Sequence, residues 1–236
     1  MFLQTLTQII FPKSCLKCNK IIINGLFCTN CWKEIEFITE PFCQICHFPF
    51  EYKLDNNSLC ASCSVKKPTY NKLITAVKYN EIISYLIGRF KFFDQTYMAK
   101  NLHQLIEPKL QEFINEIDII CAVPLDRTRL KNRKYNQSLL LSKFIAKKYN
   151  IKLVGDLLIR IKKGRYQIGL NKNARINNVK NAFIVNEKYL SLIKDKNILL
   201  IDDVVTTGAT IDNCSKVLNK NCKNIFAAAI AKRMLK

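Results

Sequence analysis

Four Cys-x-x-Cys pairs near the amino terminus constrain this sequence more than any other feature. They are Cys15/Cys18, Cys28/Cys31, Cys43/Cys46 and Cys60/Cys63, and 9, 11 and 13 residues separate successive pairs. One such turn presents two thiolates to a metal ion, and two turns complete a tetrahedral four-sulfur zinc site. The eight cysteines therefore predict two zinc sites. Spacing alone allows either consecutive pairing or a cross-braced arrangement of first with third and second with fourth.

These zinc sites are expected to be structural. Sulfur fills all four positions at each, so no position stays open for a substrate, and the metal supplies folding energy to a short segment. His47 and His103 are not needed as ligands. Clustered cysteines without an export signal favour metal binding in a reducing cytoplasm over disulfides. The other cysteines, Cys121, Cys214 and Cys222, lie in apolar or helical contexts and are expected to be packing residues.

The chain of 236 residues divides into two predicted units, residues 1–66 with the cysteine pairs and residues 67–236. No run of about 18 apolar residues predicts a membrane span. In the second unit, apolar strand-like runs at 118–125, 197–201 and 225–230 alternate with segments of helical periodicity. These segments are 82–90, 102–106, 140–145 and 211–218. Pro108 is expected to interrupt or restart the second of these helices. A short helix is expected at 1–11. The alternation predicts an α/β fold with a mostly parallel, doubly wound sheet.

The segment 197–210, NILLIDDVVTTGAT, carries the most specific pattern. An apolar strand ends in two acids, and a Thr/Gly turn leads into a helix. Such a turn directs backbone N–H groups and a helix N-terminus at one point, which favours a phosphate. Gly208 allows close approach of the backbone. The threonine hydroxyls of the turn can donate to phosphate oxygens.

The two acids, Asp202 and Asp203, need a separate role beside a bound phosphate. Ionised carboxylates accept hydrogen bonds, so they suit ribose hydroxyls or a hydrated Mg²⁺. Neighbouring residues of a regular strand face opposite ways, so both acids can serve one ligand only if the chain leaves the strand there.

This segment resembles the phosphoribosyl pyrophosphate (PRPP) motif of type I phosphoribosyltransferases. The resemblance implies that ribose hydroxyls contact Asp202 and Asp203, the candidate catalytic residues. It also implies a type I phosphoribosyltransferase-like fold and a 5-phosphate held by Thr206, Thr207, Gly208, Ala209 and Thr210.

Nearly the whole chain resembles the ComF (competence protein F) family. Beyond the cysteine pairs and the PRPP motif, the matching residues are Pro124-Leu125, Arg129, 133–137, Arg160, Gln167, Leu170, Arg175, Asn178-Val179 and Ala182-Phe183. The sequence departs from the family at Lys134-Tyr135, where Gly-Phe is usual, and at 219–222, where a Gly-Ala pair is usual. The first departure questions a turn that needs positive φ at residue 134.

The resemblance implies a role in natural transformation, in handling DNA taken up as a single strand, together with competence or DNA-processing proteins. The charge agrees with phosphate partners: the chain carries +20, of which residues 1–66 contribute +1. The excess gathers at 126–148 and 152–180, where Tyr135, Tyr149 and Tyr166 could stack on bases or could simply pack in the core or on the surface. The alternative is that AT-rich coding DNA raises the lysine content everywhere.

Two further functions fit the same residues. One is a soluble phosphoribosyltransferase that displaces pyrophosphate with a small base or amine, and the other is a PRPP-sensing adaptor whose zinc ribbon docks a protein. Arg129 and Arg133 follow a predicted strand end, where α/β sheets bind ligands, and are candidate contacts for pyrophosphate or DNA. Arg165 and Arg175 are candidates for a closing loop. The sequence identifies no acceptor and no clear general base.

Overall fold

The structure is a computed structural model, and it describes residues 12–52, 58–93, 95–161 and 182–234. The strands are β1 (Lys72–Lys78), β2 (Ile119–Ala122), β3 (Lys152–Leu153), β4 (Leu158–Arg160), β5 (Phe183–Val185), β6 (Asn197–Val205) and β7 (Asn224–Lys232). The helices are α2 (Thr29–Lys33), α3 (Ala61–Val65), α4 (Glu81–Phe92), α5 (Met98–Leu110), α6 (Arg127–Arg133), α7 (Gln137–Tyr149), α9 (Leu190–Ile193) and α10 (Ala209–Leu218). The described residues also include two 3-10 turns, η1 (Ile114–Glu116) and η2 (Glu187–Tyr189).

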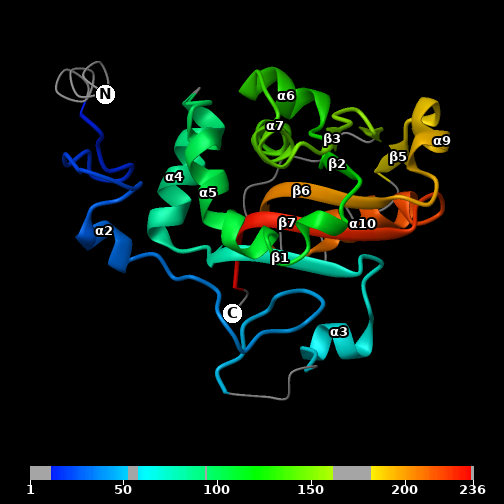
Figure 1. Ribbon diagram of the computed structural model, residues 1–236, viewed down its shortest axis with the longest axis horizontal. Coiled ribbons are helices and arrows are strands. Elements are labelled where there is room, and N and C mark those ends of the chain that lie inside the picture. Colours follow the sequence, from blue (N-terminus) through cyan, green and yellow to red (C-terminus); the bar gives the residue numbers. More distant parts are fainter. Residues whose placement is uncertain (1–11, 53–57, 94, 162–181, 235–236) are drawn as a thin grey trace.

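Five strands form one parallel sheet in the order β1-β7-β6-β2-β3 (Figure 1). β4 and β5 form a separate antiparallel pair. In the parallel sheet, all carboxyl ends lie at one edge, where an open α/β sheet binds its ligands. This topology confirms the predicted mostly parallel α/β sheet.

Helices cover both faces of the sheet because its strands are apolar on both sides. On β6, Leu199 and Ile201 pack into a core with α4, α5 and α7. The alternate residues Ile198 and Leu200 pack into a second core with α10. The doubly wound arrangement is therefore confirmed. Within the described residues, no helix is both long and apolar enough to cross a membrane.

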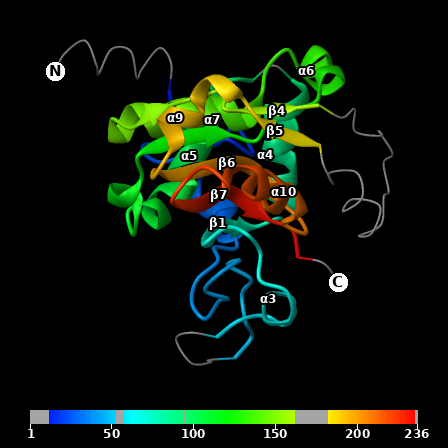
Figure 2. The same ribbon diagram turned by 90° about the vertical axis from the view of Figure 1, so that its right-hand side faces the viewer.

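The cysteine-rich segment covers the outer edge of β1. The N–H of Ile38 donates to the carbonyl of Ala76 at 2.9 Å, and the N–H of Lys78 donates to the carbonyl of Glu36 at 2.8 Å. Figure 2 shows the chain around α3 projecting below β1. An uncovered edge strand would offer unpaired backbone groups to other chains, so these bonds complete the sheet.

Several elements differ from the sequence predictions. β6 continues to Val205, four residues beyond the expected end at Ile201, because Val204 and Val205 extend the ladder with β7. α5 runs through Pro108 to Leu110, so the proline does not interrupt it. The predicted strand at 118–125 is shorter, and β1 was not expected as a separate strand. The helix expected at 1–11 lies outside the described residues.

The turn at Lys134 has a left-handed backbone although this residue carries a Cβ. Its φ is 61°, and it ends α6. A side chain with a Cβ costs roughly 1 kcal/mol in this region. Lys134→Gly should therefore raise the free energy of unfolding by about 1 kcal/mol in urea denaturation. Asn150, with φ of 53° at the end of α7, is the matched control. Asparagine tolerates this conformation, so Asn150→Gly should change stability much less; an equal gain would contradict the assignment of strain to Lys134.

Candidate functional site

The eight paired cysteines gather into two groups of four. One contains Cys15, Cys18, Cys28 and Cys31, and the other Cys43, Cys46, Cys60 and Cys63; the sulfur atoms in each group lie within 4.8 Å of one another. The Sγ atoms of Cys18 and Cys28 are 3.6 Å apart, and those of Cys46 and Cys60 are 3.5 Å apart. A tetrahedron with Zn–S bonds of about 2.3 Å has sulfur–sulfur edges of about 3.8 Å, so both groups fit zinc.

Consecutive pairs share a site, which resolves the arrangement that spacing left open. His47 belongs to neither group. Its Nδ1 accepts a hydrogen bond from the N–H of Thr75 at 3.3 Å, and its ring lies 4.0 Å from that of Phe42. Burial lowers the pKa of His47 to about 3, so the imidazole is neutral and joins the second zinc group to β1.

The second zinc group is also fixed to the sheet by its backbone. The N–H of Leu73, in β1, donates to the carbonyl of Ile45 at 2.7 Å. The buried ammonium of Lys232, at the end of β7, donates to the carbonyl of Cys46 at 2.8 Å. A four-thiolate zinc centre carries excess negative charge, so this cation lies where it offsets that charge.

The candidate phosphate loop follows β6 directly. Thr206 and Thr207 lead to Gly208, which has φ of 77° and precedes α10. The hydroxyl of Thr207 accepts a hydrogen bond from the N–H of Ala209 at 3.3 Å. A Cβ on Gly208 would lie 3.5 Å from the Tyr70 hydroxyl, so backbone conformation rather than space requires glycine here. The turn directs the N-terminus of α10 at the carboxyl edge of the sheet.

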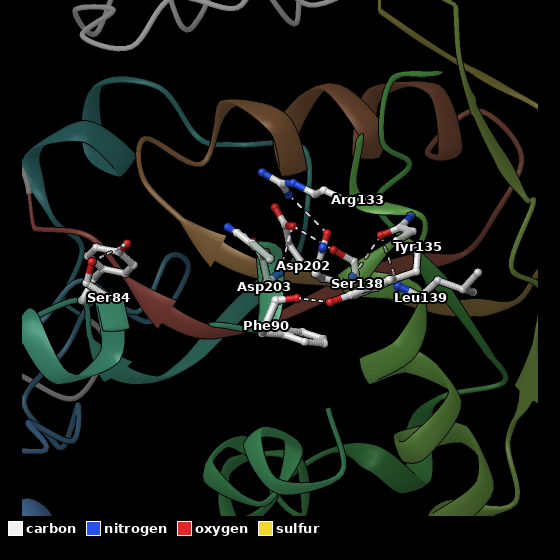
Figure 3. A network of polar contacts seen from close by, with 12 residues as sticks. Ser84, Phe90, Arg133, Tyr135, Ser138, Leu139, Asp202 and Asp203 are labelled. Atoms are coloured by element: carbon white, nitrogen blue, oxygen red, sulfur yellow. Dashed lines mark hydrogen bonds and ion pairs between the residues drawn. The ribbon is translucent and has the colours of Figure 1, made fainter. Parts of the chain in front are cut away.

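The two acids remain within β6 and have different partners. Asp202 Oδ1 accepts from the Ser138 hydroxyl at 3.1 Å and from the N–H of Asp203 at 2.8 Å. Asp203 pairs with the Lys91 ammonium at 2.8 Å. Figure 3 shows these acids beside Ser138 and Arg133. The expectation that the strand would end before the acids is wrong, because both stay in β6. Their side chains nevertheless contact α7 and α4, which pack in one core on the same face of the sheet, so both acids remain available to one ligand.

Burial shifts the titration of Asp202. Partial burial, and secondly the nearby charge of Asp203, raise its pKa from 3.8 to about 7. The hydrogen bonds from Asp203 and Ser138 oppose this shift without cancelling it. The carboxyl group therefore changes charge near neutral pH.

The candidate arginines lie on the neighbouring α6. Asp126 caps this helix by accepting from the N–H of Arg129 at 2.9 Å, and its other oxygen is 3.2 Å from Arg129 Nε. Arg133 donates to Gln137 Oε1 at 3.2 Å, and its guanidinium lies 5.1 Å from the Phe92 ring centroid. The structure thus brings Arg133 near the acids. Arg165 and Arg175 lie outside the described residues.

The beginning of α7 is tied to the carboxyl end of β2. Asn136 caps α7 by accepting from the N–H of Ser138, and its side-chain amide donates to the carbonyl of Val123 at 3.0 Å. The hydroxyl of Tyr135 donates to the carbonyl of Phe90, and Tyr149 packs on the core. These contacts favour packing roles for the two tyrosines over base stacking. Tyr166 is outside the described residues.

Sequence reasoning missed Lys91 and Ser138. Ser138 is buried at the start of α7, and a buried hydroxyl needs a polar partner, but the sequence alone did not show which one. Lys91 reaches Asp203 across 112 positions of the chain, and no local pattern marks it.

Comparison with known proteins agrees with this architecture. A double zinc ribbon domain model matches residues 6–64. Competence protein F of Haemophilus influenzae is 32% identical over 218 residues, which cover 89% of this chain and 92% of that protein. The DNA utilization protein YhgH of Escherichia coli K12 is 25% identical over 217 residues, with the same coverage.

Among solved structures, adenine phosphoribosyltransferase from Saccharomyces cerevisiae matches 61% of this chain and 72% of its own chain. The TM-score is 0.38 at 14% identity, and a likeness at this level carries no functional argument. The family assignment rests instead on competence protein F, which is 32% identical across nearly all of both chains. On that similarity, and with two four-cysteine groups of consecutive pairs, the chain belongs to the competence protein F family.

Proposed function

We propose that this chain binds PRPP, or a related ribose 5-phosphate, and acts in the uptake and use of DNA. The names of its relatives, competence protein F and DNA utilization protein, support the DNA role. In this proposal, residues 1–66 form the zinc unit, residues 67–236 the phosphate-binding unit, and the protein works in the cytoplasm. Single-stranded DNA is the proposed macromolecular partner.

The main support for the proposal is the order of three elements: β6, the turn from Thr206 to Gly208, and α10. Gly208 in its left-handed conformation leads into α10, and the two acids precede it on β6. The 5-phosphate would occupy the helix N-terminus, contacted by the turn from Thr206 to Thr210. Asp202 and Asp203 would accept from ribose hydroxyls or hold hydrated Mg²⁺. Arg133, and Arg129 beside it, would face the pyrophosphate.

A phosphoribosyl transfer to a small acceptor is the second candidate, and the position of Asp202 favours it. A carboxyl group at the ligand edge with a pKa near 7 can accept or release a proton at neutral pH. This supplies the general base that the sequence did not reveal. The adaptor role rests on the near-neutral charge of residues 1–66 and has no further observation in its favour.

Calorimetric titration of the zinc-loaded protein with PRPP and MgCl₂ tests the proposal. We expect saturable binding by the wild type and a loss of about tenfold or more in both Asp202→Asn and Asp203→Asn, since each removes a charge-assisted hydrogen bond.

Asp118→Asn is the matched control. It makes the same charge change at the opposite end of β6, where Asp118 Oδ2 accepts from the N–H of Asn197 at 2.8 Å. This variant should bind PRPP like the wild type. A folded wild type that binds no PRPP, or an equal loss in Asp118→Asn, would contradict the proposal.

A further inference from the structure

A groove lies at the carboxyl edge of the parallel sheet, on the outer side of α4. It has a volume of about 970 Å³, is open to solvent and is lined by residues from several separate segments. We call it the basic-aromatic groove, after its main lining residues: Lys17, Tyr79, Tyr85, Arg89, Phe93 and Arg233. Its size is within the range of small-ligand sites.

The sequence of α4 creates one wall of this groove. The residues Ile82, Ile83, Leu86, Ile87 and Phe90 bury one face of the helix. The opposite face, at 81, 84, 85, 88 and 89, follows helical spacing and lines the groove. Gly88 is on this face, and a Cβ there would meet no atom within 4 Å. Because glycine weakens a helix interior and nothing in the described structure requires it, its position leaves the helix backbone open to a ligand.

Aromatic rings and cations alternate along the groove. The Lys17 ammonium lies 4.4 Å from the Tyr85 ring centroid, and the Arg233 guanidinium lies 5.9 Å from that of Tyr79. Arg89 donates to the Tyr85 hydroxyl at 2.9 Å, which fixes the ring. Phe93 is 68% exposed, a large apolar surface to leave in water. Three cations face one acid, Glu81, so the groove favours an anion with flat apolar rings.

We propose that the basic-aromatic groove binds a short segment of single-stranded nucleic acid. Bases would stack on Tyr85 and Phe93, and phosphates would contact Lys17, Arg89 and Arg233. An acidic peptide would match the charge but would leave the exposed Phe93 ring in water. The inference rests on the DNA role proposed above and names its site. It does not depend on PRPP binding.

The groove adjoins the candidate phosphate loop. The N–H of Arg233 donates to the carbonyl of Val205 at 2.7 Å, and Val205 directly precedes Thr206. On the other side, Phe93 follows Phe92, whose ring lies beside Arg133. A strand in the groove therefore has one end beside the site proposed for ribose 5-phosphate. Lys17 lies between Cys15 and Cys18 of the first zinc group, so this group positions one of the residues that line the groove.

Fluorescence anisotropy with labelled dT₁₂ tests the site. We expect the wild type to bind dT₁₂ and Tyr85→Ala to bind about tenfold more weakly, the effect of losing one stacked base. The double variant Arg89→Gln/Arg233→Gln should reduce the slope of log K against log salt concentration by about 1.4, for two lost phosphate contacts. Tyr97→Ala and Lys196→Gln make matched changes at exposed residues outside the groove and should bind normally.

Gly88→Ala separates binding from folding. Alanine favours the helix, so this variant should melt about 2 °C higher, yet bind dT₁₂ several-fold more weakly because its methyl group narrows the groove. A more stable variant with unchanged dT₁₂ affinity would overturn the role of Gly88.

The proposal fails if the folded wild type does not bind dT₁₂, or if the Tyr85 and arginine variants bind it as well as the wild type does. PRPP titration of the same variants keeps the two proposals apart. Groove variants should retain PRPP binding, and Asp202→Asn should retain dT₁₂ binding. Loss of PRPP binding alone would therefore refute the phosphate-loop proposal without touching the groove.

Discussion

Replacing Cys46 by serine should destabilise the whole folded chain and not only its cysteine-rich segment. We expect the melting temperature to fall by roughly 10 °C or more, because a structural zinc site contributes folding energy directly. The site is joined to the sheet through Leu73, His47 and Lys232, so its loss also removes partners from β1 and β7. Lys232 would then be a buried cation without its neighbouring thiolate–zinc centre.

Differential scanning fluorimetry and circular dichroism measure this effect, with zinc content determined in parallel. Cys222→Ser is the matched control, because Cys222 is half-buried and belongs to neither group of four. It should lower the melting temperature by only a few degrees. If Cys46→Ser loses its zinc but melts like the control, the zinc group does not support the sheet.

Adjacent aspartates should have opposite effects on stability. Asp202 has a pKa raised to about 7, so its charged form is unfavourable in the folded protein. The folded state then binds more protons than the unfolded state between pH 3.8 and 7, and stability falls as pH rises through that range. Asp202→Asn removes this cost and should raise the free energy of unfolding by about 2 kcal/mol at pH 8.

Asp203→Asn should instead destabilise the protein by about 2–3 kcal/mol. The carboxylate and the Lys91 ammonium are 11% and 19% exposed, so removing one partner leaves a poorly solvated charge. Urea denaturation at pH 6 and pH 8 checks both variants. The gain in unfolding free energy of Asp202→Asn over the wild type should be larger at pH 8 than at pH 6. Comparing the two proteins at each pH removes the contribution of groups that titrate in both. A loss of stability in Asp202→Asn at pH 8 would contradict a buried, unfavourable charge.

If Asp202→Asn stabilises the protein, Asp202 is a position where the native residue lowers the stability of the fold. A carboxyl group that costs free energy at neutral pH, placed before a left-handed glycine, is the pattern expected of a binding residue. A ligand that donates hydrogen bonds or supplies a cation to Asp202 would recover that free energy on binding. We therefore expect PRPP affinity to rise with pH through 7.

The sequence predicted the features that local patterns encode. Cysteine spacing indicated two zinc sites, apolar runs indicated a parallel sheet, and the segment 197–210 indicated a loop between β6 and α10. Pairing between distant segments was not predictable in the same way. β6 extends past Ile201 because β7 continues beside it, and β1 is an edge strand completed by Glu36 and Ile38. Neither cause lies in the local sequence.

The same limit applies to the candidate site. Asp202 and Asp203 were found from their positions, but their partners Ser138 and Lys91 come from helices elsewhere in the chain. Tyr135 and Tyr149, two candidates for base stacking, are partly buried and pack against the core. Two exposed aromatic residues, Tyr85 and Phe93, lie instead on and just after α4, in a groove that cations from both ends of the chain also line. Only the folded arrangement brings Lys17 and Arg233 together.

Glycine-selective ¹⁵N labelling shows directly whether the loop between β6 and α10 binds PRPP. The chain has six glycines, and Gly208 lies in the loop itself. Saturating PRPP with Mg²⁺ should shift the Gly208 amide resonance strongly, while Gly25, in the first zinc group, and Gly155, near β3, stay in place. A Gly208 resonance that does not move at saturating PRPP would contradict the account.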